Sequence, residues 1–361
     1  MSGRELGAHQ RRSRDTLDEG MGCRVAVARW SQEDGVALAI EREIEALGCH
    51  AFGFTVNELL PHEVDVVLTF APYGRFGPLT RQLGRMPGSA RPKWIHWSME
   101  CFPNLRIPWP FVSRVSIARS WIDARRVAEE GRSGPARRRL MASGFGDRLT
   151  RWRIVGDYLR ALQTGLMTQL VESSSIHAEI YRAHGFDVPY VPWGMSSAWY
   201  ADLDLERDID VLWMGKRRTR RRSRILDHVR EDLSRRGVEM HVIDGVERPF
   251  VHGEERIQVL NRAKVTLNIL PRWYDTAFPF RFVHAAGNGS LVVSEPVLPH
   301  CPEIEADVHY RVAHPDALVE RIITSLRDPE PDRAIVSASR ALVRDRLSLR
   351  ESIGQLLEVI G

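Results

Sequence analysis

The sequence has no long apolar run and few cysteines, and each absence narrows the class of protein. No stretch approaches the roughly 20 consecutive apolar residues that a membrane-spanning helix needs. The amino-terminal segment, MSGRELGAHQRRSRDTLDEG, lacks the apolar core of a signal peptide. The four cysteines, Cys23, Cys49, Cys101 and Cys301, include no C-x-x-C pair, so neither a zinc site nor a disulfide framework is predicted. We therefore expect a cytoplasmic protein with free thiols and no transmembrane segment.

Lysine is also scarce, since it occurs only at Lys93, Lys216 and Lys264 among 51 basic residues. The basic residues are nearly balanced by 47 acidic ones, which leaves a formal net charge of +4. This balance argues against a protein that binds nucleic acid over its whole surface. The sequence contains no P-loop, no G-x-G-x-x-G and no Ser/His/Asp motif, so kinases, dehydrogenases and hydrolases lack their usual signatures here.

What the sequence does contain is an alternation of short apolar runs and segments with helical periodicity. Runs such as VDVVLTF (64–70), PKWIHW (92–97) and IDVLWM (209–214) predict buried strands. Strands separated by helix-length segments predict parallel sheets with helices on both faces. A chain of 361 residues exceeds the size of one core, which stops growing at about 250–300 residues. We therefore predict an α/β protein with two facing, doubly wound, Rossmann-like domains.

The predicted domain boundaries follow changes in this pattern. Residues 1–20 are polar and without periodicity, which predicts a disordered tail. The first domain is expected over 21–195 and the second over 206–335, with a last helical segment at 336–361. Parallel sheets bind ligands beyond the carboxyl ends of their strands, so two facing domains predict one deep cleft between them.

Four segments of the second half occur in an order that is typical of one enzyme group. They are DIDVLWMGKRRTRRRSRIL (208–226), LNRAKVTLNIL (260–270), FRFVHAAGNGSLVVSE (280–295) and LRDPE (326–330). Together they resemble the carboxyl-terminal half of GT-B glycosyltransferases of the spore-maturation-protein type, which is similar to the retaining glycosyltransferase family 4. In the first half, the resemblance rests on the architecture and on VPYVPWG (188–194).

The resemblance implies a hexosyltransferase-like enzyme that transfers a sugar from a nucleoside diphosphate-sugar to an acceptor. It also implies retention of the anomeric configuration, no metal ion and no cofactor besides the donor substrate. The expected partners are the nucleotide-sugar donor, held by the second domain, and a small-molecule or glycan acceptor on the side of the first. The resemblance further implies that segment 336–361 returns toward the first domain.

Donor binding is expected first at the end of the strand predicted over 209–214. Gly215 permits close approach of the backbone to a ligand, and Lys216 and Arg217 follow it directly. A nucleoside diphosphate leaves with growing negative charge, which fixed cationic groups stabilise in a closed cleft. Two alternatives stay open for this segment: a solvated, arginine-rich helix start, or a contact with nucleic acid.

The segment FRFVHAAGNGS supplies the other donor-side candidates, Arg281, His284 and Asn288. The resemblance places Arg281 at the arginine of the spore-maturation type, where it would act in both donor binding and catalysis. It places His284 where related enzymes have a glutamate that binds the ribose. A neutral imidazole cannot bind two hydroxyl groups as a carboxylate does, so a nonenzymatic nucleotide-sugar or glycan binding protein remains the alternative. Asn288, between two glycines, is a donor contact or the end of a helix.

The first domain offers one pair for acid-base chemistry, in the segment WIHWSME at a strand end. His96 and Glu100 are the only close pair of a histidine and a carboxylate at such a position. Either side chain could orient or deprotonate an acceptor hydroxyl group. The alternative for His96 is a histidine packed in the core beside Trp94 and Trp97.

Overall fold

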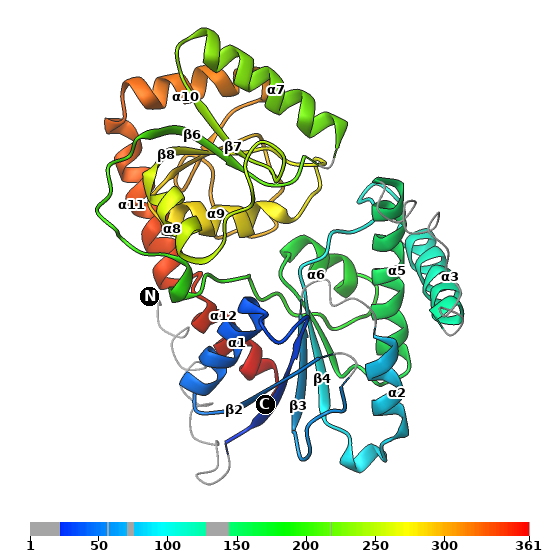
Figure 1. Ribbon diagram of the computed structural model, residues 1–361. Helices are drawn as coiled ribbons and strands as arrows, with labels where there is room; N and C mark the ends of the chain where they lie inside the picture. Colours follow the sequence, from blue (N-terminus) through cyan, green and yellow to red (C-terminus); the bar gives the residue numbers. More distant parts are fainter. Residues whose placement is uncertain (1–21, 56–57, 71–75, 128–143, 218, 361) are drawn as a thin grey trace, which may run out of the picture.

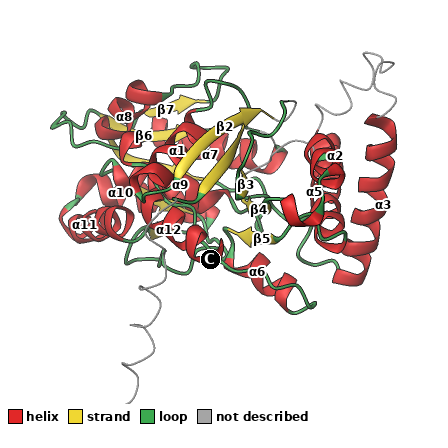
Figure 2. Cartoon of the chain, turned by 90° about the horizontal axis from the view of Figure 1, so that it is seen from below, coloured by secondary structure: helices red, strands yellow, loops and turns green. Residues whose placement is uncertain are grey.

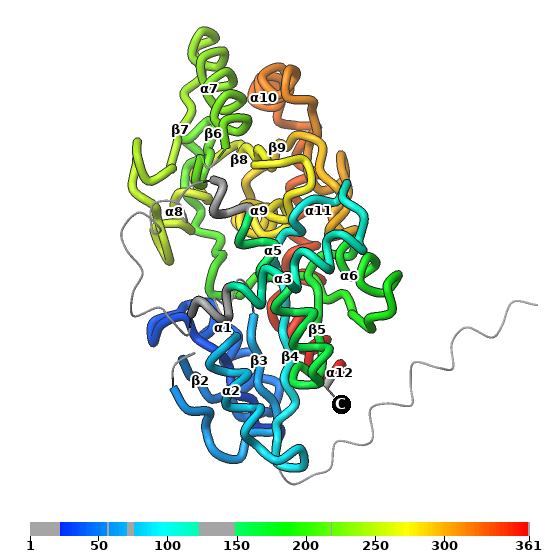
Figure 3. Tube along the Cα trace, turned by 90° about the vertical axis from the view of Figure 1, so that its right-hand side faces the viewer, coloured from blue at the N-terminus to red at the C-terminus, as the bar shows by residue number. Residues whose placement is uncertain are grey.

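The computed structural model describes residues 22–55, 58–70, 76–127, 144–217 and 219–360. The tail predicted for residues 1–20 lies outside these ranges. Within them, the chain forms two α/β domains, one above the other in Figures 1 and 3. No helix in the described ranges combines the length and the apolar composition that a membrane crossing requires.

The first domain is built on a parallel sheet with the strand order β2-β1-β3-β4-β5. The strands are β1 (Arg24–Arg29), β2 (His50–Thr55), β3 (Val66–Phe70), β4 (Lys93–Ser98) and β5 (Gln169–Glu172). The helices are α1 (Gly35–Ala46), α2 (Gly77–Arg85), α3 (Trp109–Val127), α5 (Gly144–Gln163) and α6 (Ser175–Arg182). In this sheet the strand order reverses between β1 and β3, which is the usual position of a ligand site in doubly wound domains.

The second domain has a parallel sheet with the order β10-β9-β8-β6-β7. Its strands are β6 (Ile209–Met214), β7 (Met240–Ile243), β8 (Ala263–Asn268), β9 (Leu291–Ser294) and β10 (Arg311–Val312). The helices that follow the first domain in the chain are α7 (Arg220–Arg235), α8 (Gly253–Arg262), α9 (Ala277–Gly287), α10 (Leu318–Arg327), α11 (Glu330–Asp345) and α12 (Leu349–Ile360). Two parallel sheets flanked by helices confirm the predicted α/β fold class.

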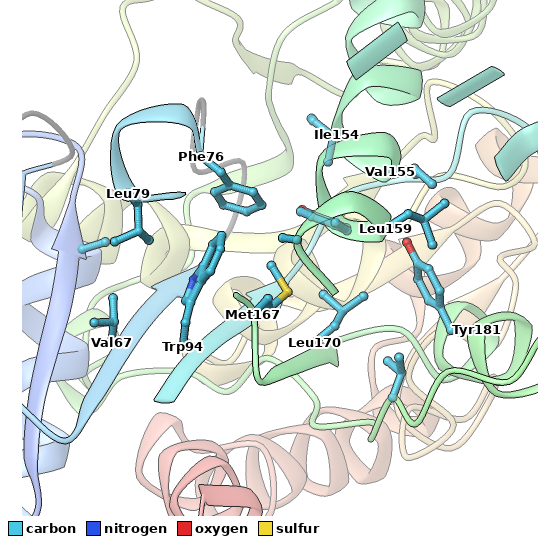
Figure 4. Packing of buried hydrophobic residues seen from close by; sticks show 14 of the residues in the cluster. Val67, Phe76, Leu79, Trp94, Ile154, Val155, Leu159, Met167, Leu170 and Tyr181 are labelled. Carbon is cyan, nitrogen blue, oxygen red and sulfur yellow. The ribbon is translucent and has the colours of Figure 1, made fainter. Parts of the chain in front are cut away.

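Both faces of each sheet are buried, as the continuous apolar runs predict. In β1, Val25 and Val27 belong to one apolar cluster and Ala26 and Ala28 to the cluster on the opposite face. Figure 4 shows the second of these clusters, where Trp94 of β4 faces the residues around α2 and α5. The same alternation divides β6 between two clusters in the second domain.

The last helix, α12, packs on the first domain although it follows the second domain in the chain. Leu349, Ile353 and Leu356 are buried in the same cluster as the β1 valines, and α12 lies beside α1 in Figure 1. Where the chain crosses back, the Met195 N–H donates to the Leu347 carbonyl (2.7 Å), and the Leu349 N–H donates to the Met195 carbonyl (2.9 Å). Two crossings held by paired backbone hydrogen bonds therefore join the domains.

Candidate functional site

A cavity of about 360 Å³ lies between the two domains. It is lined from the first domain by Met99, Glu100, Cys101, Arg151, Ser173 and Trp193, and from the second by Lys216, Arg222, Pro271, Asp275, Thr276, Ala277, Pro279, Phe280 and Arg281. Most of these residues follow the carboxyl ends of β4, β5, β6 and β8 or begin α9. This is where ligands bind in doubly wound sheets.

The second-domain wall of the cavity is cationic. Lys216 follows β6, and Arg281 projects from the second turn of α9. The Arg281 guanidinium is fixed by donating to the Asn268 side-chain oxygen (3.2 Å) and to the Ile269 carbonyl (3.0 Å) at the end of β8. The structure thus brings Lys216, just after β6, and Arg281, anchored at the end of β8, to one cavity.

Gly215 makes room for this arrangement. Its φ of 147° lies outside the range that L side chains readily adopt, and a Cβ there would lie 3.3 Å from Nη2 of Arg281. The Arg281 guanidinium therefore rests against a backbone position that carries no side chain. The close backbone approach expected at Gly215 is made by a neighbouring arginine of the protein itself.

Arg222 is a cavity residue that the sequence analysis does not single out. It is 1% exposed, and its Nη1 donates to the Lys216 carbonyl (2.8 Å). The signal was present in the spacing: positions 222, 226, 229 and 233 all lie on the buried face of α7. An arginine in a series that otherwise holds leucine and valine is a candidate for a functional role, because a buried charge needs a partner.

An ion pair joins the two domains at the cavity. Arg151 of α5 lies 3.3 Å from Asp275, and both side chains are buried. Asp275 also accepts from the Ala277 N–H (3.1 Å) at the start of α9. No pattern in the sequence indicates this pair, because its members are 124 positions apart and meet only when the domains face each other.

The two candidates of the first domain, Glu100 and His96, lie in different surroundings. Glu100 follows β4 and lines the cavity. His96 does not reach the cavity: it is fully buried, with Nδ1 2.8 Å from the Thr69 hydroxyl and Nε2 2.9 Å from the Tyr158 hydroxyl. Burial lowers the pKa of His96 to about 3, so the ring is neutral at pH 7. His96 is therefore a hydrogen-bonded core residue, the alternative that the sequence left open.

His284 and Asn288 lie behind the cavity wall. The His284 ring is buried between Phe280 and Trp199, at centroid distances of 4.7 and 5.8 Å. Burial, aided by the charge of Arg256, lowers the pKa of His284 to about 3. Asn288 donates to the Trp199 carbonyl (3.2 Å) and to the His284 carbonyl (2.9 Å), so it ties α9 to the interdomain segment. The structure does not bring either side chain to the cavity surface.

Arg217 points away from the cavity. Its guanidinium forms ion pairs with Asp227 (2.5 Å), Asp244 (2.8 Å) and Glu247 (2.9 Å). Three carboxylates occupy its donors, and Arg217 therefore braces the segment after β6 against the loop after β7. Of the three consecutive candidates after β6, Lys216 is the one that lines the cavity, and its ammonium group lies 5.9 Å from the centroid of the Phe250 ring.

Two further features bear on which ligands suit the molecule. A more open hollow of about 530 Å³ lies on the second domain, and Glu303, Glu305, His309, Asp345 and Arg346 are among its lining residues. Its mainly acidic lining suits an anionic ligand poorly, whereas the interdomain cavity offers several cationic groups. Among the residues that the structure describes, no group of three or more His, Cys, Asp or Glu side chains is arranged to hold a metal ion.

Comparison with known protein families gives one match. Residues 218–358, less than half of the chain, match a family described as glycosyl transferase-like. No curated protein sequence matches the chain.

Solved structures match over almost the whole chain. Sucrose-phosphate synthase (tll1590) from Thermosynechococcus elongatus is 13% identical, with a TM-score of 0.56 over 93% of this chain and 98% of the other. Alr3699/HepE from Anabaena, solved in complex with UDP and glucose, is 11% identical, with a TM-score of 0.53 over 94% and 99%. WaaG, a glycosyltransferase involved in lipopolysaccharide biosynthesis, is 12% identical, with a TM-score of 0.53 over 93% and 99%.

Sequence identities this low indicate a shared fold but not a shared function. The described part of the chain thus has the two-domain GT-B architecture, which confirms the fold that the resemblance implied. Its second domain, in addition, matches a glycosyltransferase-like family in sequence.

Proposed function

We propose that the protein is a glycosyltransferase that moves a sugar from a nucleoside diphosphate-sugar to an acceptor hydroxyl group. The observation that carries the proposal is the convergence of Lys216, Arg222 and Arg281 on the second-domain wall of the interdomain cavity. The glycosyl transferase-like match of residues 218–358 supports it, because that segment contains Arg222 and Arg281. The first domain supplies the opposite wall, with Glu100, for the acceptor.

In this proposal the cationic wall of the cavity stabilises the negative charge on the leaving diphosphate. The bond between the sugar C1 and the diphosphate oxygen breaks, and a new bond forms between C1 and the acceptor oxygen. The electron pair of the broken bond stays on the diphosphate, where Lys216, Arg222 and Arg281 offset the charge without a metal ion. Glu100 orients the acceptor hydroxyl, and its proton leaves to the diphosphate oxygen or to solvent. Retention of configuration is the outcome that the family resemblance favours.

The test combines donor binding with turnover. Calorimetry against a panel of nucleoside diphosphates and their sugars identifies the base and the sugar, and release of nucleoside diphosphate then measures turnover. Arg281→Ala is expected to lower turnover by roughly two orders of magnitude or more, comparable with loss of one preorganised donor. Arg281→Lys restores part of it, because lysine keeps the charge but not the planar fork.

The matched control is Arg333→Ala, which removes an exposed arginine on α11, remote from the cavity lining. It should leave both binding and turnover at the wild-type level. A folded Arg281→Ala protein with native turnover would contradict the assignment of Arg281. Failure of every nucleoside diphosphate to bind would overturn the enzyme proposal as a whole.

One observation favours a second function, a nonenzymatic protein that binds a nucleotide-sugar or glycan. The His284 ring is buried between Phe280 and Trp199, and the family resemblance places His284 where related enzymes have a ribose-binding glutamate. Without that carboxylate, the donor lacks one polar contact of the related enzymes. Tight binding of a nucleotide-sugar with neither hydrolysis nor transfer to any acceptor in the panel would decide for this function.

A further inference from the structure

Helix α3 exposes an apolar stripe on the outer side of the first domain. Phe111, Val115 and Ile122 follow one another at helical spacing and are 57%, 37% and 44% exposed, and Trp121 beside them is 52% exposed. Figures 1 and 2 show α3 at the edge of the molecule, with α5 between it and the sheet. Scattered exposed apolar residues are ordinary, but a row of large ones on a single helix face marks an interaction surface.

The opposite face of α3 is fixed to α5, so the stripe is held in place. Val112, Ser116 and Ser120 are buried there, and a Cβ on Gly156 of α5 would lie only 1.9 Å from the Ser116 carbonyl oxygen. The close approach of the two helices at Gly156 leaves α3 little freedom to rotate. Its apolar stripe therefore cannot turn inward to bury itself.

Trp121 is held as part of this surface. The Arg160 guanidinium of α5 lies over its ring, 4.0 Å from the centroid, and also donates to the Ser120 hydroxyl (2.9 Å). The indole is thus fixed at the boundary between the apolar stripe and a cationic group. An amphipathic ring beside a guanidinium is typical of a side chain at the level of lipid headgroups.

The positive charge of α3 indicates which kind of partner its apolar stripe binds. The helix contains Arg114, Arg119, Arg125 and Arg126 against one acidic residue, Asp123, so its formal charge is +3, while the whole 361-residue chain has a net charge of only +4. A helix that combines an apolar stripe of aromatic and aliphatic residues with several arginines has the composition of a segment that lies in an anionic membrane interface.

The segment that leads into α3 contacts the second domain. Arg106, three residues before α3, stacks over Trp273 of the second domain at 4.9 Å, and Trp273 is 40% exposed. The adjacent Tyr274 donates from its hydroxyl to the Pro103 carbonyl (2.9 Å). These contacts join the segment leading into α3 to the loop that supplies Pro271 and Asp275 to the cavity.

We propose that α3 docks the protein on the surface of a bilayer that contains anionic lipids. Phe111, Val115 and Ile122 enter the region between headgroups and acyl chains, while Arg114, exposed on the same helix, contacts the lipid phosphates. This inference goes beyond the proposed glycosyltransferase function and does not depend on it, because the stripe lies outside the cavity. It identifies a peripheral membrane surface on the first domain.

The test is co-sedimentation of the full chain with vesicles. Phosphatidylcholine vesicles containing about 30% phosphatidylglycerol should bind the protein, and pure phosphatidylcholine should bind it at least tenfold more weakly, since each basic residue near an anionic surface adds about a fivefold gain. Phe111→Ser/Ile122→Ser should reduce binding roughly tenfold or more. Arg114→Glu should also weaken binding, and sodium chloride at about 0.5 M should do the same to the wild type.

Trp30→Ser/Leu59→Ser is the matched control, because it removes two exposed apolar side chains of the same domain, 73% and 84% exposed. It should bind vesicles like the wild type. Circular dichroism and thermal unfolding show whether each variant is folded. Equal vesicle binding by the Phe111/Ile122 variant, or no binding by the wild type, overturns the proposal. A dimer in solution that the same variant dissociates would assign the stripe to a second copy of the chain instead.

Discussion

At the scale of single residues, Gly215 determines where the Arg281 guanidinium lies. Gly215→Ala introduces a Cβ at a φ of 147° and 3.3 Å from Nη2 of Arg281. Backbone strain of this kind costs about 1–3 kcal/mol. We therefore expect a lower free energy of unfolding. We also expect weaker nucleotide binding, because Arg281 must move away from its position beside Gly215. Chemical denaturation and calorimetry measure the two effects.

Gly84→Ala is the control for this substitution. Gly84 lies within α2, and nothing lies within 4 Å of its added Cβ. Alanine there should stabilise the protein by about 0.5–1 kcal/mol, since it restricts the unfolded chain. Nucleotide affinity should not change. If Gly215→Ala bound nucleotides as tightly as Gly84→Ala, the link between Gly215 and Arg281 would be wrong.

The site could be predicted from the sequence only in part, and the reason differs between residues. Lys216 follows a strand end, and the topology of a parallel sheet is enough to bring such a residue to the ligand edge. His96 lies inside its strand, where the side of the sheet decides whether a ring meets the cavity or the core. That side depends on which helix covers it, here α5 with Tyr158, and a single sequence does not specify this.

At the scale of elements, α12 is an integral part of the first domain. Ile353 is 1% exposed in the cluster that covers one face of the first sheet. Ile353→Ala leaves a cavity in this cluster, which costs about 2–5 kcal/mol. We expect a lower urea midpoint, measured by circular dichroism.

The neighbouring Gly354 offers a control on the same helix. Its added Cβ meets nothing within 4 Å, so Gly354→Ala should raise the urea midpoint slightly. An unchanged midpoint in Ile353→Ala would show that α12 contributes little to the first domain.

The bounds of helices and strands were easier to predict from the sequence than the elements against which they pack. The strand expected at 209–214 is β6 with the same bounds, because a short apolar run between polar segments is unambiguous when both faces of the sheet are covered. By contrast, the apolar spacing of α12 indicates that it must pack on something but not on which domain. Packing partners are set by the course of the chain, and here that course crosses back at Met195 and Leu347.

At the scale of the whole molecule, the cavity depends on contacts between the domains. Besides the pair of Arg151 and Asp275, the Ser174 hydroxyl lies 2.8 Å from Nδ1 of His300, and the Ser175 N–H donates to the His300 carbonyl (2.9 Å). Each of these contacts joins residues more than 120 positions apart. No local pattern in a sequence indicates such a pairing, which is why this part of the site emerges only from the structure.

Both domains share one consequence of burial, a sensitivity to acid. Burial lowers the pKa of His96, His177, His284 and His300 to about 3, whereas the ordinary value is 6.5. Below pH 6.5 the unfolded chain takes up protons that the folded chain does not, so stability falls as the pH drops toward 3. Burial raises the pKa of Glu172 well above its ordinary value, which has the opposite sign and offsets part of this loss. We expect a net loss of about 3–4 kcal/mol per pH unit between pH 6 and 5, measured by urea unfolding.

His284→Leu separates this cause from general acid denaturation. The His284 ring nitrogens have no hydrogen-bond partner among the described residues, so leucine removes a titrating group without leaving a donor or acceptor unpaired. The pH slope should become shallower by about 1 kcal/mol per pH unit. Phe282→Leu on the same helix, at a buried position without a titrating group, should lower stability at every pH and keep the slope. If the slope were the same in His284→Leu as in the wild type, the imidazole would already be protonated in the folded protein, and its burial would not be the source of the acid sensitivity.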